Sequence, residues 1–244
     1  MNKNGREAEV YFEYHADSAS ENPCDIRMTA VMSAEEYATT RSRFPVYEEE
    51  LDARVKAYGG WYCIFMPHLK EYPEIYKELT PFVADNGNLE TERFIQALKS
   101  RMAAFVEQAL GTDKVYIFEN VMFQQVLNEL LRKMDCDEQQ MIAYILEIEQ
   151  ISKVAAERVS DNYLLYPDWL DWMIDYVQQS EYGRRHKVSG RAGLMDYFRE
   201  WLSIEENCFD RLAADKQEIL INHIDYNEQN NYIYSRLFEK GAAR

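Results

Sequence analysis

Glycine and proline are scarce in this chain of 244 residues, which contains nine of the former and six of the latter. Low-complexity, linker-rich and collagen-like proteins need far more of both, so these classes are excluded. No glycine is followed by lysine, and the phosphate-binding loop G-x-x-x-x-G-K-[ST] is therefore absent. The patterns G-x-G-x-x-G, H-E-x-x-H and G-x-S-x-G are absent too, so the sequence carries no dinucleotide, metalloprotease or serine-hydrolase signature.

Cysteine and histidine are also few, and neither is clustered. The four cysteines are Cys24, Cys63, Cys136 and Cys208, which form no C-x-x-C pair, and the four histidines are scattered. Zinc sites use close pairs of these ligands, so no such site is expected. In a chain without a secretory signal, these cysteines are expected to be reduced and structural.

Long hydrophobic runs are missing as well. The longest uninterrupted apolar runs, such as Trp61 to Met66, are far short of the roughly 20 residues that cross a bilayer. The first residues, Met1 to Glu9, contain no apolar segment of the kind found in signal peptides. We therefore expect no membrane partner and a cytoplasmic location.

Acidic residues dominate the charge of the chain. It contains 27 Lys and Arg against 43 Asp and Glu, which gives a formal net charge of −16. A nonspecific nucleic-acid binder needs the opposite sign, so that class is excluded. Aromatic residues make up 14% of the chain, with 18 tyrosines, which indicates a sizeable core rather than disorder.

Hydrophobic periodicity predicts many helices and few strands. A helix begins at the capping-box pattern Ser33-Ala-Glu-Glu36, and further helices are predicted over 47–58 (closed by Gly59-Gly60), 72–79, 90–110, 123–134, 137–159, 168–179, 194–212 and 230–239. Strands are predicted over 9–14, 61–66, 115–118 and 218–224. The sequence thus indicates a single α/β domain, 1–244, which is strand-poor and mostly helical, with a helical segment over 194–244.

The segment 180–193 is unusually basic for this chain. Arg184, Arg185, Lys187 and Arg191 fall within eight residues with no acid between them, and Gly190 precedes a predicted helix. A basic loop that leads into a helix N-terminus can bind an anion through guanidinium groups and free backbone N–H groups. A solvated loop that offsets an acidic surface is an equally good interpretation.

Three further features have both a functional and a structural interpretation. Glu119 directly follows an apolar strand, where a carboxylate can hold Mg²⁺ or accept a proton, or can cap the next helix. Arg158, at the end of its predicted helix, can reach a phosphate or complement the helix dipole. Trp169, Trp172 and Tyr176 share a helical face, and packing in the core or at an interface is expected there rather than base stacking.

Several short segments occur in an informative order. They are Asn22-Pro-Cys-Asp25, Glu71-Tyr-Pro-Glu-Ile-Tyr-Lys-Glu-Leu79, Asn86-Gly-Asn-Leu-Glu-Thr-Glu-Arg-Phe94, Lys114-Val-Tyr-Ile-Phe-Glu119, Phe123-Gln-Gln125, Leu127-Asn-Glu-Leu130, Asp168-Trp-Leu170, Tyr182-Gly183 and Gly190-Arg-Ala-Gly193. This series resembles an uncharacterised bacterial family of P-loop NTPases with a kinase-like build. The resemblance runs from about residue 9 to the C-terminus.

The resemblance has two departures. Members of the family begin with a strand, a Walker A loop and a helix, and this chain starts where that unit would end. They also have a strand between the helices matching 141–150 and 151–158, which are expected to join directly here. The resemblance therefore implies a degenerate three-layer kinase-like fold without its central strands. Glu119 matches the strand-end acid of the family, and 184–191 matches its basic lid-like region.

Without a cradle for the β-phosphate, we expect the ATP affinity and the phosphotransferase activity of this chain both to be very low. The first hypothesis is a non-catalytic interaction or regulatory module, with a protein partner or a second copy covering the incomplete sheet and with no cofactor. The alternative is an ATP-dependent nucleotide or small-molecule phosphotransferase whose Walker A unit is supplied separately. Mg-ATP would then be the cofactor, Glu119 the metal ligand, and Arg158, Arg184, Arg185 and Arg191 the phosphate-binding cations. An enzyme of another class ranks last, because no nucleophile–base pair is visible.

Overall fold

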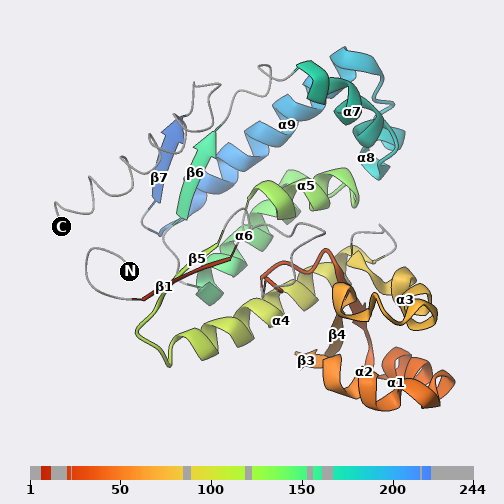
Figure 1. The fold of residues 1–244 in the computed structure, drawn as a ribbon. Coiled ribbons are helices and arrows are strands. Elements are labelled where there is room, and N and C mark those ends of the chain that lie inside the picture. The colour runs from red at the N-terminus through yellow and green to blue at the C-terminus, as the bar shows by residue number, and fades with distance from the viewer. Residues whose placement is uncertain are drawn as a thin grey trace. The chain divides into compact units, whose positions relative to one another are not determined.

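The computed structural model describes residues 7–11, 21–22, 24–84, 89–118, 123–152, 156–160, 167–214 and 216–220. Its described elements are mostly helices, together with a small three-stranded antiparallel sheet and two pairs of parallel strands (Figure 1). The chain 1–244, predicted as one domain, falls into two compact units. Unit 1 is Met1–Ser152 and unit 2 is Lys153–Arg244.

The antiparallel sheet of unit 1 has the order β2-β4-β3, from β2 (Thr29–Met32), β4 (Trp61–Phe65) and β3 (Lys56–Tyr58). The two-residue turn Gly59-Gly60 joins β3 to β4, and both glycines have positive φ, 56° and 92°. Two-residue hairpins favour such angles, which glycine adopts without steric cost. At Gly59 a Cβ would also lie 2.3 Å from Ser100 Oγ, so the turn lies very close to the helix that contains Ser100.

The helices α1 (Ala34–Arg43), α2 (Glu48–Arg54) and α3 (Pro73–Leu79) surround this sheet. Short 3₁₀ turns lie beside them at η1 (Pro45–Tyr47), η2 (Met66–Leu69) and η3 (Thr80–Phe82). Their apolar side chains form one buried core; the fully enclosed members are Ala30, Met32, Leu51, Ile64, Met66, Leu69, Ile75 and Leu79. Burial of this set, at roughly 2 kcal/mol for each large side chain, stabilises the first part of unit 1.

The rest of unit 1 is built on α4 (Thr91–Ala109), which packs against α6 (Glu138–Ser152) and β3. The helix α5 (Gln124–Arg132) carries buried leucines at Leu127, Leu130 and Leu131. The strand β1 (Ala8–Tyr11) pairs in parallel with β5 (Val115–Phe118). Parallel pairing of strands about a hundred residues apart requires a long crossover, as α/β folds provide.

The described part of unit 2 contains a second parallel pair and three helices. The strand β6 (Ala156–Ser160) pairs with β7 (Lys216–Leu220). The helix α7 (Pro167–Gln178) packs against α8 (Glu181–Arg185) and α9 (Gly190–Arg211). The core of this unit includes Leu194, Tyr197, Phe198, Trp201, Cys208 and Phe209, which lie along one side of α9.

The predicted capping box at Ser33 is confirmed, and a second one is observed at Asp137. The Ser33 side chain accepts the Glu36 N–H at 3.2 Å, and the Glu36 carboxylate accepts the Ser33 N–H at 2.6 Å, which starts α1. Asp137 and Gln140 make the same reciprocal pair at 2.8 and 3.0 Å before α6. Each pair satisfies two backbone donors that a helix start otherwise leaves without partners.

The predicted helix over 47–58 is wrong in its second half. α2 ends at Arg54, and β3 begins at Lys56. Gly59-Gly60 is therefore a hairpin turn rather than a helix stop. Since β3 gains a ladder of backbone hydrogen bonds from β4, this pairing overrides the local helical pattern.

The helix predicted to run through 137–159 is also shorter than expected. α6 ends at Ser152, and residues 156–160 form β6 instead of a second helical piece. The expectation that no strand follows this helix is therefore wrong. The strand is stabilised by β7, more than fifty residues later, a partner that no local pattern reveals. The predicted strand 218–224 is observed as β7, and the predicted helix 230–239 lies outside the described residues.

The Glu36 carboxylate makes the stability of unit 1 depend on pH. Burial alone would raise the pKa of Glu36, but hydrogen bonds from the Ser33 N–H and the Arg93 guanidinium outweigh burial and lower it. A carboxyl with a lowered pKa stabilises the fold above its ordinary pKa, and this contribution is lost as pH falls through the folded value.

We expect Glu36→Gln to reduce the free energy of unfolding by about 1 kcal/mol at pH 7 and by progressively less below about pH 4. Urea denaturation of both proteins between neutral and acidic pH measures this. Glu35→Gln, in the same helical turn but exposed, is the matched control. A difference between Glu36→Gln and the unsubstituted chain that stays constant with pH would contradict the assignment.

Candidate functional site

The basic segment predicted to be a lid-like loop over 180–193 is largely helical. Ser180 caps α8 by accepting the Gly183 N–H at 3.0 Å. Gly183 is buried, and a Cβ there would lie 2.0 Å from the carbonyl oxygen of Val177. Only glycine therefore allows α8 to pack this closely on the end of α7. The turn between α8 and α9 is confined to 186–189, so the expected loop is shorter than predicted.

The four cations of this segment all lie at the surface. Arg184 donates to Glu181 at 2.7 Å and to the carbonyl oxygen of Gln179 at 2.6 Å. Lys187 and Gly190 have positive φ, 54° and 58°, which turns the chain sharply into α9, and Arg191 follows at once. The structure exposes all four of these sequence neighbours, which we call the basic patch: Arg184, Arg185, Lys187 and Arg191.

The two other predicted site residues are not placed with this patch. Glu119 lies outside the described residues. Arg158 lies in β6, opposite Glu218 in the register with β7, and not at the end of a helix as predicted. The side chain of Arg158 is also outside the described part of the chain.

An aromatic surface lies on α7, which contacts α8 within the same unit. Trp172 is 57% exposed and stacks on Tyr176 with ring centroids 4.9 Å apart. On the opposite side of α7, Met173 and Val177 are buried. The predicted stripe therefore has an exposed edge instead of lying wholly in the core, whereas the side chain of Trp169 lies outside the described part.

A buried arginine, which sequence reasoning missed, organises one side of unit 1. Arg101 of α4 is 1% exposed. Its guanidinium donates to Glu21 Oε1 at 2.8 Å, to Thr29 Oγ1 at 2.9 Å and to the carbonyl oxygen of Asn22 at 3.2 Å. These bonds hold the segment before β2 against α4.

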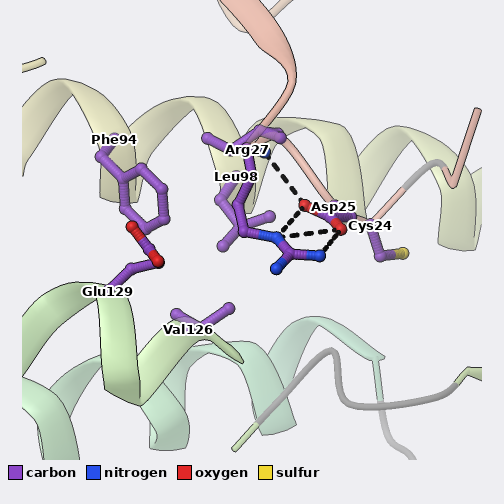
Figure 2. A pocket seen from close by; sticks show the side chains of 8 residues that line it. Cys24, Asp25, Arg27, Phe94, Leu98, Val126 and Glu129 are labelled. Carbon is purple, nitrogen blue, oxygen red and sulfur yellow. Dashed lines mark hydrogen bonds and ion pairs between the residues drawn. The ribbon is translucent and has the colours of Figure 1, made fainter. Parts of the chain in front are cut away.

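A small cavity lies next to that segment. Figure 2 shows the Arg27 guanidinium held by Asp25, at 2.7 Å, and the Glu129 carboxylate of α5 turned toward the Phe94 ring of α4. The cavity has a volume of about 10 Å³, enough for roughly one water molecule. It cannot take an organic substrate.

The Glu129 carboxylate beside this cavity forms ion pairs with two cations at the C-terminal end of its own helix, α5. It lies 3.3 Å from Arg132 and 2.6 Å from Lys133, and the side chains of Glu129 and Arg132 are both 5% exposed. Such a buried cluster holds its geometry because separation of the charges would leave one of them unpaired in the interior. We therefore regard it as structural.

Burial makes three of the cysteine thiols poor nucleophiles. Burial raises the pKa of Cys24 to about 12 and those of Cys63 and Cys136 to about 11. These thiols stay protonated at neutral pH, and only a thiolate attacks. Cys208 is also a free, buried thiol.

Within the described residues, no group of three or more His, Cys, Asp and Glu side chains is arranged to hold a metal ion. Among the helices of that part, none has the length and apolar character to cross a bilayer.

No protein-family model, curated protein or solved structure matches this chain.

Replacement of Arg101 tests its structural role. We expect Arg101→Met to lower the free energy of unfolding by about 3 kcal/mol, because Glu21 and two backbone carbonyls lose their buried partner. Urea denaturation gives the change. Arg101→Met combined with Glu21→Gln should recover part of the loss, and Arg199→Met, an exposed site on α9, should cost little. A loss below 1 kcal/mol would contradict the role assigned to Arg101.

Proposed function

We propose that the chain is a non-catalytic interaction module, derived from a P-loop kinase-like NTPase, that recognises a protein through the α7–α9 surface of unit 2. The observation that carries this proposal is the exposed Trp172–Tyr176 stack on α7. Tryptophan, tyrosine and arginine are the residues that most often dominate the energy of protein interfaces. All three occur on this part of unit 2, since the basic patch follows α7 directly.

The charges of this surface favour a second copy of the chain as the partner. Asp171 and Asp175 flank Trp172 and are exposed, while the basic patch lies on α8 and at the start of α9. In a two-fold symmetric dimer, the face of α7 that carries Trp172 and the two aspartates can contact the basic patch of the other copy. The symmetry then forms the same contact a second time. Two copies that each carry a net charge of −16 repel each other, but salt screens this repulsion beyond the Debye length, about 8 Å at physiological ionic strength.

The kinase-like origin is supported by the two parallel strand pairs, β1–β5 and β6–β7. Parallel strands occur almost only in α/β proteins, where longer sheets are covered by helices on both faces. Each described strand of these pairs has one hydrogen-bonded neighbour among the described residues. This arrangement fits an α/β sheet that has lost strands, and it is the reason we prefer this ancestry.

The alternative is the phosphotransferase whose Walker A unit is supplied separately. It is favoured by the concentration of Arg184, Arg185, Lys187 and Arg191 just before and at the start of α9, where the helix dipole adds positive potential. In that case the basic patch would contact phosphate. In the proposed module it contacts carboxylates of another copy.

Trp172→Ala tests the proposal directly. We expect the self-association constant of the chain to fall at least about 30-fold, which corresponds to a hot-spot loss of about 2 kcal/mol. Analytical ultracentrifugation over a range of concentrations measures it. Leu110→Ala, which removes an apolar side chain 81% exposed in unit 1, is the matched control and should change nothing.

A charge exchange makes the test specific. Asp171→Lys with Asp175→Lys should abolish self-association, and so should Lys187→Glu with Arg191→Glu. A mixture of these two variants should associate again, because each then carries the surface that the other lacks. Arg199→Glu, 70% exposed on α9, controls for the change in net charge. A monomeric wild-type chain at all concentrations, or a mixture that stays monomeric, would contradict this partner.

A further inference from the structure

A hollow of about 250 Å³ lies in unit 1, between α4 and the strands β1, β3 and β5. Its lining combines aromatic rings with carboxylates. The rings are Tyr11, Tyr58, Phe105 and Tyr116, and the carboxylates are Glu9 and Glu21. The volume is close to the lower end for small-ligand sites, so a compact ligand fits it.

The aromatic rings form walls that stand at right angles. Phe105 of α4 meets Tyr11 at 85°, with centroids 5.9 Å apart, and meets Tyr116 at 88°, with centroids 5.0 Å apart. Tyr11 is fixed from its other side by Phe118, which stacks on it at 4.9 Å. Rings held in this way present electron-rich faces and edges in fixed positions, and such an arrangement attracts organic cations.

The groups of this hollow already hold cations of the chain itself. Lys56 Nζ lies 2.6 Å from Glu21, and Lys114 Nζ lies 3.3 Å from Glu9. The guanidinium of Arg101 lies 5.7 Å from the centre of the Tyr58 ring. The two lysines are 55% and 34% exposed, so a ligand ammonium group can displace either of them into solvent.

Glu9 is ionised at neutral pH and exposed. The hydrogen bond from the Tyr11 hydroxyl, at 2.6 Å, and the nearby Lys114 lower the pKa of Glu9. The same hydrogen bond and burial raise the pKa of Tyr11, which therefore remains a neutral donor. A fixed negative charge thus lies beside the aromatic walls.

We propose that this hollow binds a small organic ammonium ion, with its positive charge against Glu9 and its alkyl groups between the tyrosine rings and Phe105. The formal net charge of −16 favours the approach of a cation over that of an anion. This site is separate from the α7–α9 surface and does not rest on the function proposed for it.

Calorimetric titration of the full chain with choline and with ethanolamine tests the site. The control for choline is its neutral analogue, in which a carbon atom replaces the nitrogen, and the control for ethanolamine is ethylene glycol. We expect at least one cation to bind at least about tenfold more tightly than its neutral control. No binding of either cation up to about 10 mM, or equal binding of cation and control, would overturn the proposal.

Two variants distinguish binding in this hollow from nonspecific attraction of a cation to the acidic surface of the chain. Glu9→Gln should weaken cation binding about tenfold, because it removes the negative charge beside the rings, while Lys114 keeps Glu7 as a partner at 3.2 Å. Phe105→Leu should weaken it by removing an aromatic wall at similar volume. Glu35→Gln removes an exposed carboxylate from α1 and should have no effect. Equal effects of Glu9→Gln and Glu35→Gln would also overturn the proposal.

Discussion

The buried guanidinium of Arg101 is the interaction on which the rest of unit 1 depends. A charge that is 1% exposed is tolerated only with partners around it, and Arg101 finds them in Glu21, Asn22 and Thr29. The requirement fixes the segment before β2 on the side of α4. It thereby places Asp25 at the one-water cavity, and Glu21 and Tyr58 at the larger hollow. Among the described residues, both of these cavities thus adjoin the segment that this buried charge holds in place.

The elements that the sequence predicts well are those with local causes. The start of α1 follows from Ser33 and Glu36, and the start of α6 from Asp137 and Gln140. The long helices α4 and α9 follow from their apolar faces. Each of these signals acts within a few residues, so no knowledge of the tertiary fold is needed.

The elements that the sequence misses have distant or ambiguous causes. Gly59-Gly60 is equally compatible with a helix stop and a hairpin, and only pairing with β4 decides for β3. The stretch Ala156–Ser160 has a single β-branched residue, Val159, and becomes a strand through β7. Local propensity is a weak guide wherever such a partner exists.

The candidate sites show the same division. A run of four cations within eight residues is visible in the sequence, and in the structure each of them is exposed, on or next to a helix rather than in a long loop. Arg101 was missed because α4 contains other, exposed charges. A signal did exist: Arg101 lies three residues after Leu98 and seven after Phe94, which places it on the buried face of the helix. Residues from four separate elements line the aromatic hollow, so no local sequence pattern predicts it.

The proposed interaction module requires that the chain acts through its surfaces and not through nucleotide chemistry. Calorimetric titration of the folded chain with Mg-ATP tests this claim most directly. We expect no binding tighter than about 100 μM, because the sequence lacks the G-x-x-x-x-G-K-[ST] loop whose backbone N–H groups cradle the β-phosphate. Tighter binding that is lost when Arg184 and Arg185 are both replaced by alanine would contradict the account and would make the basic patch a phosphate site.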